Sequence, residues 1–99
     1  MDRNMVLDFQ IRDLIDSVVK IDSEVEMELF FKELLTESEI ETLSKRWRIL
    51  RMLNEGATQR EIAKELQVSL CKVTRGAKIL KDEKSVLAKM IKEKKDDIK

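Results

Sequence analysis

The 99-residue chain lacks several residue types on which common classes of protein depend. It has no proline and only two glycines, so few positions interrupt a helix. A single cysteine, Cys71, excludes an internal disulfide, and without histidine we expect neither a metal site nor a histidine-based catalytic site. No apolar run approaches the ~18–20 residues that cross a bilayer, and no signal-peptide pattern opens the chain. These absences predict a cytoplasmic protein that is not an enzyme and has no membrane partner or tightly bound cofactor.

The residues that are present favour helices and a small core. Leu, Ile, Glu and Lys are abundant, which predicts an all-α fold. Only three Phe and one Trp are available, so a compact core built by one chain would be modest. We therefore expect one domain that completes its apolar core by oligomerising.

The net charge is zero, but the two signs are separated along the chain. Residues 1–42 carry four basic and twelve acidic side chains, a net charge of −8. Residues 43–99 carry sixteen basic and eight acidic side chains, a net charge of +8. This asymmetry is typical either of well-solvated helices or of a protein with a positive surface for nucleic acid. The positive part contains residues 58–75, whose pattern is typical of DNA-binding units. We therefore favour a positive surface for nucleic acid.

Apolar spacing and helix-capping sequences predict about six helices. Sequences of the type Ser/Thr-x-x-Glu, in which the hydroxyl and carboxylate satisfy the first N–H groups, begin at Ser23, Thr36 and Thr58. Gly56 is the expected end of the third helix, whose apolar residues on more than one face predict neighbours around it. Ser69 is the expected cap of the helix that begins at residue 70. The predicted helices cover about residues 2–20, 23–34, 36–55, 59–66 and 70–80, and a last one begins at Asp82 or Ser85 and leads to a charged tail at 94–99.

Residues 58–75 have the pattern of a helix-turn-helix unit. Their two short helices flank a turn that is too tight for the helices to lie side by side. Ala63 is small enough for a close crossing, Val68 fills the corner, and Val73 packs back from the second helix. In such units the second helix enters the major groove of DNA. Gln67 stands where many such units have Gly, and a left-handed conformation there costs about 1 kcal/mol.

The second helix of this unit has one apolar and one polar face. Val73, Ala77 and Leu80 share the apolar face, which we expect to pack inward. Lys and Arg on the other face can pair with guanine or phosphate, and a Thr can contact either of these or a thymine methyl group. The alternative is an ordinary amphipathic helix with a solvated basic face. The residues that we predict to contact DNA are Gln59, Arg60, Ser69, Leu70, Cys71, Lys72, Thr74, Lys78 and Lys81.

Arg46 and Arg75 form a second group of interest. An arginine plane stacks on aromatic rings, and its fork binds carboxylates. Gly76 follows Arg75 and has no side chain, so we expect a space beside the helix there. Two arginines at such a gap would suit an aromatic amino acid. The alternative, which spacing alone favours, is that both arginines contact phosphates or acidic neighbours.

From Leu35 to Lys81 the chain resembles the bacterial Trp repressor family. The resembling residues are Leu35-Thr36, Arg46, Arg48-Ile49, Gly56, Gln59-Arg60-Glu61, Glu65-Leu66, Thr74-Arg75-Gly76 and Leu80-Lys81. The resemblance implies an intertwined, all-helical homodimer that presents two DNA-reading heads to a near-palindromic operator. Residues 27–58 also resemble the Trp-repressor-like proteins of Gram-positive bacteria, which share the short loop before Gln59.

In that family, tryptophan binds between head and core as a corepressor. The resemblance implies that Arg46 and Arg75 sandwich the indole, that Gly76 leaves room for it, and that the partner subunit's backbone receives the ammonium. Lys72 and Ile79 stand where the family has smaller hydroxyl side chains, so we expect them to fill or reshape the pocket. The predicted tryptophan-binding residues are Leu35, Thr36, Arg46, Arg75, Gly76 and Ile79.

Together these patterns predict a single domain, 1–99, with a dimerisation core at 1–56, a helix-turn-helix at 57–81, and a C-terminal helix and tail at 82–99. The expected function is that of a homodimeric repressor of a biosynthetic operon, with tryptophan as its corepressor. Two alternatives stay open. One is a helical protein-interaction adapter without DNA binding, and the other is a regulator of this type that does not use tryptophan.

Overall fold

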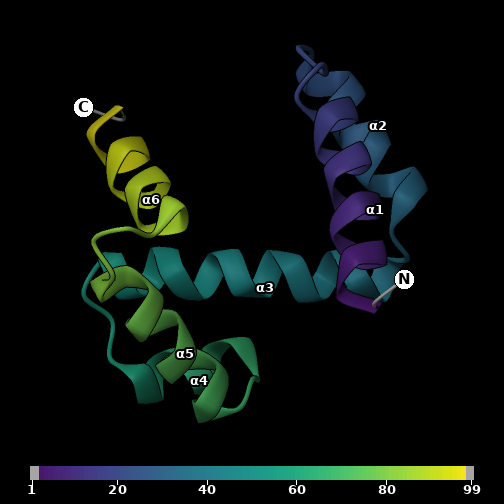
Figure 1. Ribbon diagram of the computed structural model, residues 1–99. Helices are drawn as coiled ribbons and strands as arrows, with labels where there is room; N and C mark the ends of the chain where they lie inside the picture. The colour runs from purple at the N-terminus through teal and green to yellow at the C-terminus, as the bar shows by residue number, and fades with distance from the viewer. Residues whose placement is uncertain (1–2, 98–99) are drawn as a thin grey trace. The chain divides into compact units, whose positions relative to one another are not determined.

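The computed structural model describes the backbone of residues 3–97 and the side chains of residues 8–93. These residues form six helices and no strand, so the all-α prediction is confirmed (Figure 1). None of these helices combines the length and apolar character needed to span a membrane. The helices are α1 (Arg3–Val18), α2 (Glu24–Leu34), α3 (Glu37–Asn54), α4 (Gln59–Leu66), α5 (Leu70–Lys81) and α6 (Val86–Asp97).

The chain divides into two compact units, Met1–Glu37 and Ser38–Lys99. The predicted boundary between a dimerisation core and a head lies at residue 56, inside the second unit. That functional division stays a prediction. The predicted helix start at Asp2 and the tail residues 98–99 lie outside the described residues.

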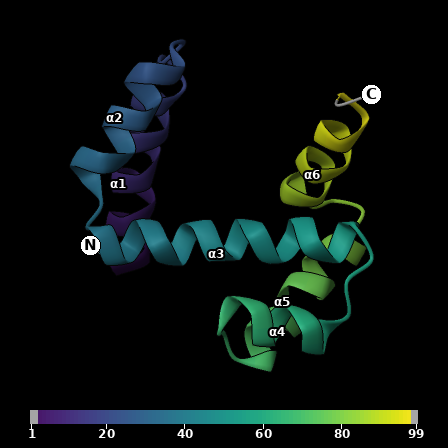
Figure 2. The same cartoon turned by 180° about the vertical axis from the view of Figure 1, so that it is seen from behind.

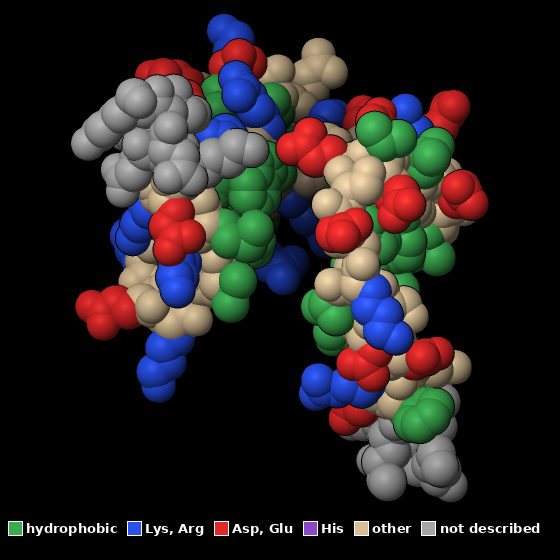
Figure 3. Space-filling model, turned by 90° about the horizontal axis from the view of Figure 1, so that it is seen from above, with side chains coloured by type: hydrophobic (Ala, Val, Ile, Leu, Met, Phe, Trp, Pro, Cys, Tyr) green, Lys and Arg blue, Asp and Glu red, His purple; other side chains and the backbone are tan. Residues whose placement is uncertain are grey.

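The N-terminal unit contains α1 and α2. Ser23 caps α2 as predicted, because its Oγ accepts a hydrogen bond from the backbone N–H of Glu26 at 3.3 Å. No side chain between residues 8 and 37 is buried, and Val25 is 68% exposed. Hydrophobic side chains, green in Figure 3, are visible at the surface of this unit and of the other. The described side chains of the N-terminal unit, residues 8–37, therefore form no buried core in a single chain.

One exposed ion pair lies on α2. The Lys32 Nζ is 2.9 Å from the Glu28 Oε1, one helical turn away. The hydrogen bond from Lys32 and its positive charge lower the pKa of the Glu28 carboxyl below its ordinary value. Such a solvent-exposed pair contributes little to the free energy of folding, so it does not substitute for a buried core.

The C-terminal unit has a buried core. Ile49 and Met52 of α3, Ile62 of α4 and Val73 of α5 form one cluster, in which Ile62 and Val73 are completely buried. Figures 1 and 2 show α4 and α5 on one side of the C-terminal part of α3 and α6 on the other side. This arrangement gives α5 a firm support on its inner side.

Only the C-terminal part of α3 is buried. We expected neighbours on several faces of this helix, yet Leu43 is 42% exposed and Trp47 is half-buried. The helix ends at Asn54, and Gly56 adopts φ of +98° after it, as a helix-ending glycine does. Leu43, in the first half of α3, is therefore left largely exposed by the described part of the Ser38–Lys99 unit.

The last helix, α6, begins after Ser85, whose Oγ accepts a hydrogen bond from the backbone N–H of Ala88 at 3.1 Å. Of the two predicted starts, Asp82 and Ser85, the second is thus the one observed. Ala88 and Ile91 are buried. The helix continues to Asp97, into the stretch that we expected to be a tail, because Lys and Glu favour helix.

Candidate nucleic-acid interface

The helix-turn-helix unit forms with the predicted local geometry. Thr58 Oγ1 accepts a hydrogen bond from the Glu61 N–H at 3.2 Å and begins α4. Gln67 ends it in the left-handed conformation, with φ of 55° and ψ of 48°. Ser69 Oγ then accepts from the Lys72 N–H at 3.3 Å and begins α5. Both caps and the left-handed Gln67 are confirmed, and together they fix the angle between the two helices.

The inner face of α5 packs as predicted. Val73 is fully buried, and Ala77 and Leu80 are half-buried. Ala63 and Val68 pack against the same core from α4 and the turn. Leu70, at the N-terminal end of α5, is 48% exposed. The helix is thus held from one side and open on the other, which is the requirement for insertion into a groove.

The structure corrects one expectation, that of a space beside Gly76. Gly76 is buried, and a Cβ added there would lie 2.8 Å from Cγ2 of Ile49 and 3.4 Å from Cδ1 of Leu53. Because Gly76 has no side chain, α5 can approach α3 closely at this position. The physical reason is that Ile49 already fills the position, which a pattern of residues along one helix cannot reveal.

The exposed face of α5 is positively charged. The α5 sequence contains four basic residues and no acidic residue. Among the described residues, no ion pair involves the basic side chains of α4 or α5. The predicted DNA contacts that lie exposed are Arg60, Ser69, Leu70, Cys71, Lys72, Lys78 and Lys81, whereas Gln59 and Thr74 are half-buried. Their assignment as DNA contacts stays a prediction, and their exposure is compatible with it.

Gln59 and Thr74 contact each other. The Thr74 hydroxyl donates to Oε1 of Gln59 at 2.9 Å and lies 3.0 Å from the backbone carbonyl oxygen of Leu70. The bond joins the first turn of α4 to the second turn of α5. Because it links residues fifteen positions apart across a helix crossing, the sequence pattern gave no signal of it. These two residues therefore brace the head internally, whatever contacts they make with DNA.

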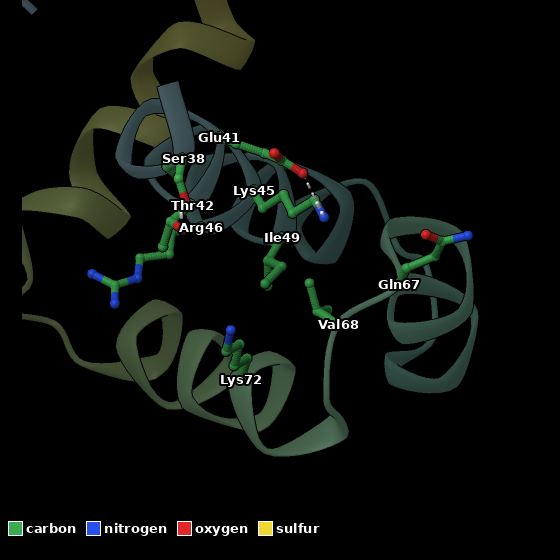
Figure 4. A pocket seen from close by; sticks show the side chains of 9 residues that line it. All are labelled: Ser38, Glu41, Thr42, Lys45, Arg46, Ile49, Gln67, Val68 and Lys72. Atoms are coloured by element: carbon green, nitrogen blue, oxygen red, sulfur yellow. Dashed lines mark hydrogen bonds and ion pairs between the residues drawn. The ribbon is translucent and has the colours of Figure 1, made fainter. Parts of the chain in front are cut away.

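A pocket of about 210 Å³ lies beside the head, between α3 and the α4–α5 turn (Figure 4). In Figure 4, Lys72 points from α5 toward α3, and Arg46 reaches from α3 toward α5. The lining residues are Ser38, Glu41, Thr42, Lys45, Arg46, Ile49, Gln67, Val68 and Lys72. Of the predicted tryptophan-binding residues, only Arg46 lines this pocket.

The remaining predicted tryptophan-binding residues are distributed over both units. Arg75, Gly76 and Ile79 are on α5, where Arg75 is exposed and Ile79 is half-buried. Leu35 and Thr36 belong to the N-terminal unit. Lys72, which we expected to reshape the pocket, does line the space next to Arg46. The tryptophan site itself stays a prediction.

Comparisons with known proteins identify the family. The model of the Trp repressor protein family matches residues 10–95. The "Trp operon repressor homolog" proteins of Xylella fastidiosa strains M23, Temecula1 and 9a5c are each 46% identical over 70 residues, which is 70% of this chain and 76% of theirs. No solved structure matches. The family match spans most of the chain and both units, and on these findings the chain belongs to the Trp repressor family.

Proposed function

We propose that this chain is a homodimeric transcriptional repressor that binds a near-palindromic DNA operator in the cytoplasm. Membership of the Trp repressor family implies a DNA-binding transcriptional regulator, and the family consists of regulators that are not enzymes. The name of the Xylella relatives, Trp operon repressor homolog, supports repression of a biosynthetic operon. The single observation that carries the proposal is the two-sided character of α5. Val73 is buried on its inner side, and all of the charged residues of the helix are basic.

The dimer is supported by the apolar side chains that one chain leaves exposed. On α2, Val25 and Leu29 are 68% and 50% exposed and lie one helical turn apart. Exposed apolar surface of this kind marks an interaction site. In a two-fold dimer this surface would be buried on both subunits, because such an interface uses the same patch of each. Two-fold symmetry then demands two half-sites, which in helix-turn-helix dimers, the Trp repressor among them, lie ~34 Å apart or a multiple of that.

DNA binding is tested by Lys78→Ala. Lys78 is exposed on α5, and we expect its loss to weaken binding and to lower the slope of log affinity against log salt by about one unit per subunit. Fluorescence anisotropy on an operator obtained by in vitro selection measures both quantities. The matched control is Lys64→Ala on α4, which removes an exposed lysine outside the predicted contacts. Binding that does not respond to salt in the parent protein would instead favour the protein-interaction adapter.

We propose tryptophan as the corepressor on the basis of the family and of the relatives' name. Arg46 and Arg75 both belong to the Ser38–Lys99 unit, but Ile49 fills the position beside Gly76. Calorimetry of the dimer with tryptophan up to millimolar concentration tests this proposal. We expect a heat of binding that disappears in Arg75→Gln. A titration without heat would leave a regulator of the same family that does not use tryptophan.

A further inference from the structure

The hydrogen bond between α4 and α5 leaves one half of the Gln59 amide unused. The Thr74 hydroxyl donates to Oε1 of Gln59 at 2.9 Å, across the crossing of the two helices. A glutamine amide also has an NH2 group, which can donate twice. Within residues 8–93, no hydrogen bond uses Nε2 of Gln59, and no unpaired polar side-chain atom is buried. The donor half of this amide is therefore open to solvent and available to a partner molecule.

The hydroxyl of Thr74, by contrast, is already used inside the protein. A hydroxyl has a single proton to donate. Both polar atoms next to it are acceptors, because Oε1 of Gln59 lies at 2.9 Å and the backbone carbonyl oxygen of Leu70 at 3.0 Å. Thr74 is also half-buried. While these bonds are in place, the Thr74 hydroxyl has no proton to donate to a base or a phosphate.

We propose that Thr74 is a positioning residue for DNA binding, whose hydroxyl turns the Gln59 amide so that its NH2 group donates to a phosphate of the operator. This inference rests on the proposed repressor function, and it gives Thr74 an indirect role in place of a direct contact. Glutamine side chains are common donors to phosphate oxygens, and such contacts fix the register of a protein on the duplex without reading its bases. Gln59 is the first residue of α4 and precedes the exposed Arg60, another predicted DNA contact.

The bond acts by ordering Gln59 before DNA arrives. Glutamine has a long, flexible side chain, and immobilising such a side chain at an interface weakens association. Because Thr74 holds Oε1, part of this ordering occurs during folding and no longer opposes binding. The amide is neutral, so its contact with a phosphate releases no bound cation from the DNA. Operator affinity should therefore depend on Thr74, whereas the slope of log affinity against log salt should not.

The first test compares Gln59→Ala, Thr74→Val and the double variant with Thr74→Ser, a control that keeps the hydroxyl. Fluorescence anisotropy of the full-length protein on an operator from in vitro selection measures the affinity. We expect Gln59→Ala to weaken binding by about tenfold or more, because hydrogen bonds to charged groups are strong and a dimer loses two of them. Thr74→Val should weaken it by about threefold or more, through the lost ordering of Gln59, and Thr74→Ser should restore parent affinity. The double variant should bind no more weakly than Gln59→Ala, since the two residues act through one contact.

A scan of the operator backbone separates positioning from a loss of stability. One phosphate at a time is replaced by a neutral methylphosphonate. In each half-site we expect one phosphate whose replacement weakens binding of the parent protein and of Thr74→Ser. The same replacement should have little effect on Gln59→Ala and a reduced effect on Thr74→Val. A less stable head would lower affinity without changing which phosphate matters, and urea denaturation of each variant measures that stability separately.

Two kinds of result would overturn the positioning role and leave the repressor standing. A double variant that binds clearly more weakly than Gln59→Ala, or a changed base preference in Thr74→Val, would show that Thr74 contacts DNA itself. Parent affinity or an unchanged phosphate pattern in Thr74→Val would show that its hydroxyl does not act through Gln59. A parent protein that selects no DNA sequence would instead reject the repressor, and this inference with it.

Discussion

The two units of this chain differ in where their apolar side chains are placed. In Ser38–Lys99, Ile62, Val73 and Ile91 are removed from water almost completely. In Met1–Glu37, no described side chain is buried, although α1 and α2 carry a similar kind of apolar residue. The C-terminal unit therefore contains a buried core that stabilises it. The N-terminal unit instead exposes apolar surface, which stabilises the protein only when another surface buries it.

This difference has a functional meaning. A DNA-reading helix must keep its shape while it exposes charged side chains, so α5 is fixed from behind by a core within its own unit. A dimerisation region has the opposite need, because its apolar residues must be available to a partner. The buried side chains of the described residues accordingly lie in the C-terminal unit, behind α5.

The largest effect is expected from Ile62→Ala. Ile62 is 0% exposed and belongs to the core cluster that α4 forms with α3 and α5, so its truncation leaves a cavity in the core of the C-terminal unit. We expect a loss of about 2–5 kcal/mol in the free energy of unfolding. Urea denaturation followed by circular dichroism measures it.

Its control is Leu70→Ala, which removes a similar volume from an exposed position of α5. That change should stay within about 0.5 kcal/mol of the parent protein. Equal losses in the two variants would show that the C-terminal unit has no core of the kind described here.

A weaker but more diagnostic effect is expected from Val25→Asp. Val25 is exposed on α2 in the single chain, and in a two-fold dimer the introduced carboxylate would be buried twice. We expect the dissociation constant of the dimer to rise at least tenfold, as measured by sedimentation equilibrium. Glu33→Gln, on the same helix and also exposed, should leave the constant unchanged. A Val25→Asp protein that dimerises like the parent would place the interface elsewhere.

Features that depend on neighbours along the chain were predicted correctly. The caps at Ser23, Thr58 and Ser69 need only a hydroxyl three residues before a free N–H group, so their pattern is visible in the sequence. The left-handed Gln67 follows from its place in the turn, where many helix-turn-helix units have Gly. These local features also predicted the six helices and the inward face of α5.

Features that depend on how helices cross were predicted poorly. The bond between Thr74 and Gln59 and the filled position beside Gly76 both require the relative placement of two helices. The same holds for Leu43, which the pattern suggested would have neighbours and which is exposed. Periodicity identifies an apolar face, but it does not tell which element covers that face, or whether the cover comes from the same chain.

The smallest effect is expected from Gly76→Ala, which tests the contact that supports α5 on α3. Alanine favours a helix over glycine by about 1 kcal/mol, so on propensity alone the variant would be more stable. The added Cβ would meet Cγ2 of Ile49 at 2.8 Å, and overpacking of this kind costs about 1–3 kcal/mol. We expect the second effect to exceed the first, with a net loss of up to about 2 kcal/mol in urea denaturation.

A double-mutant cycle with Ile49→Ala separates this close approach from ordinary backbone strain. In the Ile49→Ala background the contact is gone, so Gly76→Ala should become neutral or stabilising. Gly56→Ala provides the comparison, because Gly56 has φ of +98° and nothing within 4 Å of an added Cβ. Its loss comes from the backbone alone and should be the same in both backgrounds. If the effect of Gly76→Ala were also unchanged by Ile49→Ala, α5 would not rest on α3 at this position, and the head would lack the support that distinguishes it from the N-terminal unit.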